Sequence, residues 1–276
     1  MDFYSEAPKS FRLLVCRDVD GPSSARIAEH FVPNEPMFDA ILLAGPLLHQ
    51  DVENKEDKAV AEGDISSIFA QLENIVCRVL YLPSEYDPSD ILAEQLHLTP
   101  NSVNIHGRQI ALTDTLHLMG FSEKGEKIAR LAYSQDDRDR SAESDDEMEN
   151  VQLSSANSIS IITEMLTNSA ANQPSAPTST PTTPLSSGIF MLNYRYSHTL
   201  NQLLFHMGES LDSAGVRLCV LCSDSPETDR LPAKFGNYHI AAPKSLRETG
   251  GYTVVDIAFN EDTAAWDEIT VTNKQL

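Results

Sequence analysis

Apolar residues in the first third of the chain gather into short runs separated by polar loops. The runs at residues 11–16, 38–44 and 75–82 are almost continuously apolar, which is typical of strands buried on both faces of a sheet. Between them, apolar residues at helical spacing predict helices at residues 25–31 and 65–72. Strands that alternate with helices indicate βαβ units and therefore an α/β fold with a parallel core.

The same alternation continues on both sides of one long polar segment. An amphipathic helix is predicted over residues 199–211. The short runs before the polar segment are expected to form a meander that extends the first sheet or builds a second one. Further short strands are predicted at residues 102–105, 108–112, 116–121, 189–192, 217–222, 239–243 and 252–257.

The polar segment at residues 134–187 begins with an acidic cluster and ends rich in Ser, Thr and Pro. Such a composition buries too little apolar surface to offset the entropy of ordering, so a disordered insertion is expected, with regulated phosphorylation as an alternative role. The chain therefore divides into a tail at residues 1–10, two parts of one domain at residues 11–133 and 188–276 with a short C-terminal tail, and the insertion between them.

The charge balance restricts the classes of partner. Acidic residues number 41 against 20 basic ones, giving a formal net charge of −21. Phosphate binding depends on Lys and Arg, so nucleic acid and anionic membranes are not expected as direct partners. No apolar run approaches the roughly 20 residues that span a bilayer, and the N-terminus lacks signal-peptide features. A cytosolic or nuclear protein is expected.

The four cysteines are expected to be buried thiols. Cys16, Cys77, Cys219 and Cys222 all lie inside apolar runs, as reduced core cysteines commonly do. The spacing Cys219-Val-Leu-Cys222 fits a zinc or redox motif, but it falls within a predicted strand and has no second pair. A zinc or redox role is therefore the alternative to burial.

The polar loops that follow the strands, together with residues 101–108 and 245–256, resemble the calcineurin-like metallophosphoesterase superfamily. The resemblance covers residues 11–133 and 188–260. It implies a four-layer α/β/β/α sandwich of two packed mixed sheets. In that family, five strand-end loops supply the ligands of two metal ions. These ions generate hydroxide and stabilise the attacking and leaving oxygens of the displacement.

The first two loops depart from the family pattern at functional positions. The family has Asp-x-His in the first loop, where this chain has Asp18 and Asp20. It has Gly-Asp in the second, where this chain has Gly45 and Pro46. The missing Asp is the carboxylate that bridges the two metals in the family, and a proline side chain cannot coordinate a metal.

The third and fourth loops lose further ligands. Where the family has Gly-Asn-His-Asp in the third loop, this chain has Ser84-Glu85-Tyr86-Asp87, so only the final Asp matches. The Asn ligand and the catalytic His of the family are both absent. Tyr194 stands where the fourth loop of the family carries a His.

The fifth loop has Asp224 and Pro226 where the family has the two His of Gly-His-x-His. Only Asp18 then survives as a directly coordinating residue of the family site. No metal is expected to bind; the alternative is a rebuilt carboxylate site for a divalent ion such as Mg²⁺ or Mn²⁺. Its ligands would be Asp18, Asp20, Glu85 and Asp224.

The resemblance implies a catalytically inactive metallophosphoesterase-like domain that binds other proteins as an interaction or scaffold subunit. B-subunits of replicative DNA polymerases and a retromer coat subunit resemble it in losing metal ligands while keeping the fold. The alternatives are a divergent hydrolase of phosphate esters and a small-molecule or nucleotide-binding module. The sequence contains no Gly-x-Ser-x-Gly, Gly-rich phosphate loop or His-Glu-x-x-His pattern. Asp18, Asp20 and Asp87 could pair for acid–base chemistry, and loop or capping roles are the alternative for these three residues.

Overall fold

The structure is a computed structural model. It describes residues 10–31, 38–47, 55–75, 78–84, 87, 99–122, 162, 187–194, 197–223 and 232–276, with the backbone alone described at 55–63 and 197–203. The predicted insertion at 134–187 lies outside these residues except for Ile162 and Ser187.

Six strands form a first mixed sheet in the order β12-β11-β1-β2-β3-β4. The neighbours β1, β2, β3 and β4 are parallel, whereas β11 runs antiparallel to both β1 and β12. The strands are β1 Ser10–Arg17, β2 Ala40–Ala44, β3 Val79–Leu82, β4 Ser102–Asn104, β11 Gly251–Asn260 and β12 Ala265–Gln275.

A second mixed sheet has the order β5-β6-β7-β8-β10-β9, with a parallel centre and antiparallel strands at both edges. The predicted meander is thus divided, since β4 extends the first sheet and β5 and β6 begin the second. The strands are β5 Arg108–Ala111, β6 Leu116–Ser122, β7 Ser187–Asn193, β8 Val216–Cys222, β9 Lys234–Phe235 and β10 Tyr238–Ala241.

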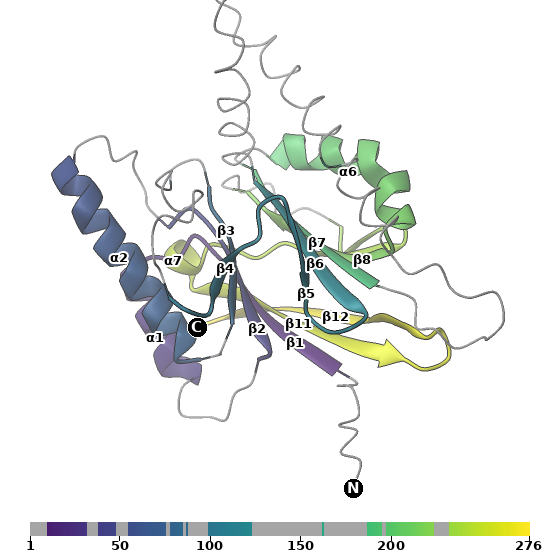
Figure 1. Ribbon diagram of the computed structural model, residues 1–276, viewed down its shortest axis with the longest axis horizontal. Coiled ribbons are helices and arrows are strands. Elements are labelled where there is room, and N and C mark those ends of the chain that lie inside the picture. Colours follow the sequence, from purple (N-terminus) through teal and green to yellow (C-terminus); the bar gives the residue numbers. More distant parts are fainter. Residues whose placement is uncertain are drawn as a thin grey trace, which may run out of the picture.

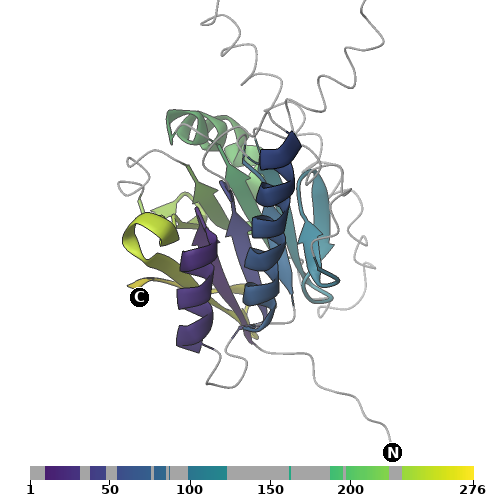
Figure 2. The same cartoon turned by 90° about the vertical axis from the view of Figure 1, so that its left-hand side faces the viewer.

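The two sheets pack face to face, with helices on the outer faces (Figure 1). Helices α1 (Gly21–Phe31) and α2 (Lys55–Glu73) lie side by side against the first sheet, as Figure 2 shows. Helix α6 (Ser197–Ser213) covers the second sheet, and the short α7 (Leu246–Thr249) precedes β11. The predicted α/β/β/α sandwich of two mixed sheets is therefore confirmed.

Four strands of the first sheet, β1, β2, β3 and β11, contribute side chains to two hydrophobic layers. On β1, Leu13 and Val15 face the core between the sheets, while Leu14 and Cys16 face the layer beneath α1 and α2. Alternate side chains of a strand point to opposite faces. The continuous apolar runs in the sequence are explained by this two-sided burial.

Several elements differ in extent from the sequence-based expectation, and α2 differs most because it begins at Lys55 rather than residue 65. Helix α1 begins at Gly21 rather than residue 25, and β3 begins at Val79 rather than residue 75. Ile75 instead closes a turn after α2, its N–H donating to the Leu72 carbonyl over 3.0 Å. β12 was not predicted; it occupies most of the region expected to be a tail.

The described cysteines are buried free thiols, as predicted. Cys219 faces the layer under α6 and Cys222 faces the core between the sheets, because residues three apart on a strand point to opposite faces. They therefore cannot form a disulfide or share a metal. Burial raises the pKa of both Cys16 and Cys219, which keeps these thiols protonated, whereas Cys77 lies outside the described residues. Within the described part of the chain, no helix is long and apolar enough to cross a membrane.

His106 links the two sheets and is held as a neutral imidazole. Its Nδ1 accepts a hydrogen bond from the Ser122 N–H at 3.1 Å, and its ring centroid lies 4.7 Å from that of Phe121. Burial lowers the pKa of His106 to about 4. A proton on Nδ1 would also remove the acceptor of the Ser122 N–H.

The free energy of unfolding should decrease as pH is lowered from about 6.5 to about 4. The unfolded chain binds a proton at residue 106 in this window and the folded chain does not, which amounts to about 3 kcal/mol at pH 4. Burial also lowers the pKa of His117 and His239, so these residues contribute to the pH dependence of the parent. The test therefore compares the pH dependence of the parent with that of a variant that lacks only His106. Urea titrations of His106→Gln should show a flatter pH dependence than the parent.

The exposed residue His206 on α6 provides the control. The variant His206→Gln should keep the parental pH dependence. Equal pH dependence in the parent and His106→Gln would show that His106 titrates normally and contradict the prediction.

Candidate functional site

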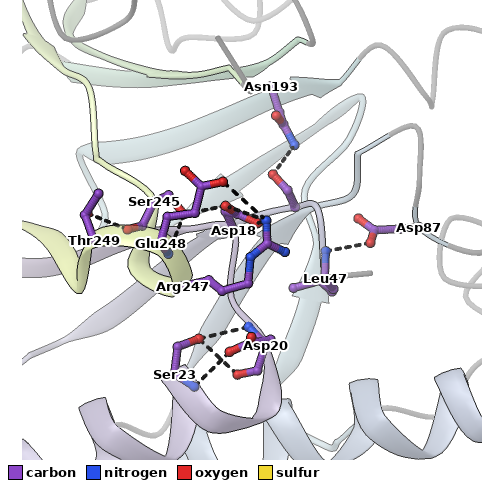
Figure 3. Close-up of polar contacts among 11 residues, drawn as sticks. Asp18, Asp20, Ser23, Leu47, Asp87, Asn193, Ser245, Arg247, Glu248 and Thr249 are labelled. Atoms are coloured by element: carbon purple, nitrogen blue, oxygen red, sulfur yellow. Dashed lines mark hydrogen bonds and ion pairs between the residues drawn. The ribbon is translucent and has the colours of Figure 1, made fainter. Parts of the chain in front are cut away.

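The carboxyl ends of β1, β2 and β3 meet at one edge of the first sheet. Arg17 pairs with Ala44, and Ala44 pairs with Leu82, so the three strands end in register. The loops that follow them therefore start side by side, at the edge where α/β sheets place ligands. Figure 3 shows the polar groups gathered there.

Asp18, the first residue after β1, is buried and fixed through both its backbone and its side chain. Its backbone has φ of 56°, its N–H donates to the Ala44 carbonyl at 3.1 Å, and its own carbonyl accepts the Arg247 N–H at 3.1 Å. The Ser245 hydroxyl donates to Oδ2. Arg247 Nη2 lies 2.9 Å from Oδ1 and 3.1 Å from Oδ2, so a guanidinium already neutralises this carboxylate (Figure 3).

Helix α7 places Arg247 against Asp18. Ser245 caps the helix by accepting the Glu248 N–H at 3.1 Å, and Gly250 closes it in the left-handed conformation with φ of 69°. The backbone of Ser245 also forms an isolated parallel β-bridge with Arg17 at the end of β1. A short helix fixed at both ends thus holds a permanently charged side chain at the Asp18 carboxylate.

The Gly45-Pro46 turn after β2 is packed tightly against the loop after β3. The peptide bond between the two residues is cis, and the Gly45 N–H donates to the Leu82 carbonyl at 2.9 Å. A Cβ at position 45 would collide with Asp87 Oδ2 and lie 2.7 Å from the Ser84 nitrogen. Glycine is therefore required here by close approach.

Asp87 ties these two loops together with both carboxylate oxygens. Oδ1 accepts the Leu47 N–H at 2.7 Å and Oδ2 accepts the Ser84 N–H at 2.7 Å. The residue is only 1% exposed. Short bonds from backbone N–H groups to an ionised acceptor are among the stronger hydrogen bonds in proteins. Asp87 acts here as a structural clamp.

The second sheet contributes Asn193, the last residue of β7. Its Nδ2 donates to the Leu82 carbonyl at 3.2 Å and to the Gly45 carbonyl at 3.4 Å. Tyr194, the residue expected to occupy the fourth loop of the site, instead packs in the hydrophobic layer under α6. The residue that reaches the other loops is therefore one position earlier than predicted.

Asp20 caps α1. Its Oδ1 accepts the Ser23 N–H at 2.8 Å, and the Ser23 hydroxyl accepts the Asp20 N–H at 2.9 Å. This reciprocal arrangement resembles a capping box, and it explains why α1 starts earlier than expected.

The rebuilt carboxylate site is only partly covered by the structure. Glu85, Tyr86, Asp224 and Pro226 lie outside the described residues. Of the other two proposed ligands, Asp18 is paired with Arg247 and Asp20 caps a helix. Within the described ranges, no three His, Cys, Asp or Glu residues form a group that could hold a metal. The described residues do not fit the two-metal centre of the family.

Sequence reasoning did not single out Asn193, Ser245 or Arg247. Ser245 and Glu248 have the spacing of a helix cap, Ser-x-x-Glu, and this pattern was a usable signal for α7. No local pattern links Arg247 to Asp18, because the two are separated by most of the chain.

Comparisons with known proteins support the fold. No family model matches the sequence, and no curated protein matches it significantly. One solved structure aligns with a TM-score of 0.59 and 11% identity, covering 96% of this chain and 99% of the other. The crystal structure of TT1561 of Thermus thermophilus aligns with a TM-score of 0.51 and 14% identity over the same shares. At such low identity, these similarities show a shared two-sheet α/β fold and nothing about activity.

Proposed function

We propose that the chain is a degenerate calcineurin-like metallophosphoesterase domain that has lost catalysis and serves as a protein-interaction or scaffold subunit. The observation that supports this most is the ion pair between Arg247 and Asp18. Asp18 is the position that the resemblance assigns to a metal ligand, and a guanidinium neutralises its charge.

A guanidinium can replace the charge of a metal ion but not its chemistry. Arginine stays protonated throughout the physiological pH range and has no coordination site for water. It therefore cannot generate a hydroxide nucleophile or bridge attacking and leaving oxygens, the functions that two metals supply. A divalent ion would have to displace Arg247 to reach the Asp18 carboxylate.

Two further observations support the proposal. Pro46 stands at the position of the bridging carboxylate, and it has no metal-binding atom in its side chain. Asp87, the retained residue of the third loop, already accepts two backbone hydrogen bonds. The retained motif residues thus have structural roles that do not involve a metal.

Calorimetric titration with Mn²⁺ and Mg²⁺, paired with hydrolysis of bis-p-nitrophenyl phosphate, tests the proposal. We expect no micromolar metal binding and no metal-dependent turnover by the full chain. Micromolar binding with turnover that is lost in Asp18→Ala and kept in Asp114→Ala would overturn the proposal. That result would establish the alternative, a divergent phosphate-ester hydrolase. Asp114 is a suitable control because it is an exposed loop aspartate.

A further inference from the structure

The first sheet ends in a long strand whose outer edge is open within the described part of the chain. β12 is 11 residues long, is the terminal strand of the sheet and pairs with β11. It packs over β7, β8 and β10 of the second sheet (Figure 1). It contains no proline, and an open, regular strand edge is a template for pairing with another chain.

The register of the hairpin shows which backbone groups face outward. The Leu276 N–H donates to the Gly250 carbonyl at 3.0 Å, in the same register as the pairs Val254↔Thr272 and Tyr252↔Lys274. Hydrogen-bonded pairs alternate with non-bonded pairs in an antiparallel ladder. Thr270, Thr272 and Lys274 therefore bond to β11, and the intervening residues of β12 direct their N–H and C=O groups to the outer edge, where no described strand pairs with them.

A polar pocket of about 360 Å³ opens beside the start of this edge. Its wall on the second sheet carries Arg217 of β8, Lys234 of β9 and His239 of β10. Asp267 and Glu268 of β12 stand on the opposite wall. Arg217 and Lys234 form a local cationic wall from two strands of the second sheet, which stands out in a chain of net charge −21.

The two cations of this pocket, Arg217 and Lys234, have no ion-pair partner among the residues that the structure describes. Lys234 is near enough to His239 to contribute, after burial, to the lowered pKa of that imidazole. Asp267 Oδ2 accepts the Thr263 hydroxyl at 2.8 Å, but its Oδ1 is buried without a hydrogen-bond partner in the described part. The pocket thus offers the cations Arg217 and Lys234 to an anion.

We propose that β12 binds an extended segment of another protein by strand addition, with an acidic side chain of that segment directed at the cationic wall. The segment's backbone would pair with the outward groups of Ile269, Val271 and Asn273. This inference rests on the proposed interaction role and names its docking surface.

Two observations favour such a segment over other occupants. Ile269 and Val271 are partly buried against the core between the sheets, so an added strand would cover the rest of their apolar surface. Arg217 and Lys234 form no ion pair among the described residues, so an acidic side chain of the segment would supply their counter-charge. At physiological salt, exposed charges more than about 8 Å apart are largely screened. The electrostatic attraction of an acidic peptide to this edge therefore depends on the nearby cationic wall more than on the net charge of the chain.

Hydrogen exchange of the free full chain gives the first test. The amides of Ile269, Val271 and Asn273 should exchange faster than those of Thr270 and Thr272. Equal protection of the two sets would show that the edge is already paired and would overturn the proposal.

Binding of a synthetic peptide with the sequence Thr-Val-Glu-Val-Glu-Val-Thr gives the second test. It should slow exchange at the outward amides and bind about tenfold more tightly than the analogue with Lys in place of Glu. Arg217→Ala should remove most of this preference. Equal binding of the two peptides, or binding that leaves the β12 amides unprotected, would overturn the proposal.

Val271→Pro provides a matched backbone test. It deletes an outward N–H and leaves the bonds to β11 intact, as edge-strand prolines do, so peptide binding should be lost while the far-ultraviolet circular dichroism is kept. Val271→Ala, which retains the N–H, should still bind. Equal binding by these two variants would also overturn the proposal. None of these readouts depends on metal or turnover, so failure here is distinguishable from failure of the proposed function.

Discussion

Replacing Asp87 with alanine should lower the free energy of unfolding by about 3–5 kcal/mol. The carboxylate accepts the N–H groups of Leu47 and Ser84, each at 2.7 Å, and it is buried. Alanine would leave both donors buried without an acceptor, and each loss costs more than an exposed bond because no water replaces the partner. Urea denaturation of the full chain measures the change.

Asp87→Asn provides a graded comparison. The amide has one oxygen, so it can accept from one of the two N–H groups while its NH₂ faces the other donor. Its stability should fall between those of the parent and Asp87→Ala. The exposed Asp114→Ala should change stability by less than about 0.5 kcal/mol. A loss below about 1 kcal/mol in Asp87→Ala would show that the two loops are held together by other contacts.

The clamp also accounts for Gly45 and Asp87, two residues that match the metallophosphoesterase pattern, by contacts that involve no metal. Gly45 is required because a Cβ there would collide with Asp87. Asp87 is required in turn by the two N–H groups that it satisfies. Retention of Gly45 and Asp87 is therefore accounted for by packing and hydrogen bonding at the strand ends, and it gives no support to metal binding.

The layered core could be predicted from the sequence because burial on both faces leaves continuous apolar runs. β2 is the clearest case, since every residue from Ala40 to Ala44 is buried. β12 could not be predicted in the same way. From residue 267 onward its side chains are only partly buried or exposed, so polar and apolar residues mix without a strong signal. Its pairing with β11 depends on the hairpin register.

The site could be predicted only as a set of loops. A shift of one residue moves a strand side chain to the opposite face of the sheet, and this shift separates the expected Tyr194 from the observed Asn193. The Arg247 contact depends on tertiary structure, since the pairing of β11 with β1 and the bridge between Arg17 and Ser245 place α7 beside the end of β1. Local sequence patterns do not carry that information.

The ion pair between Asp18 and Arg247 should show strong coupling in a double-mutant cycle. Arg247→Ala leaves the Asp18 carboxylate buried with Ser245 as its remaining side-chain partner and should cost about 2–4 kcal/mol, less than a fully buried pair because Arg247 is 22% exposed. Asp18→Ala removes the buried charge as well, so the double variant should be more stable than the sum of the single losses predicts, by about 1–3 kcal/mol.

The neighbouring contact between Arg247 and Glu248 is the matched control for this cycle. It spans 3.9 Å, and Glu248 is 68% exposed, so Glu248→Gln should couple to Arg247→Ala by less than about 0.5 kcal/mol. Coupling of similar size in both pairs would mean that Arg247 acts as a general surface charge. Strong coupling to Asp18 alone would instead identify Arg247 as the built-in cation of this carboxylate, and the coupling energy then measures the interaction that a metal ion would have to replace.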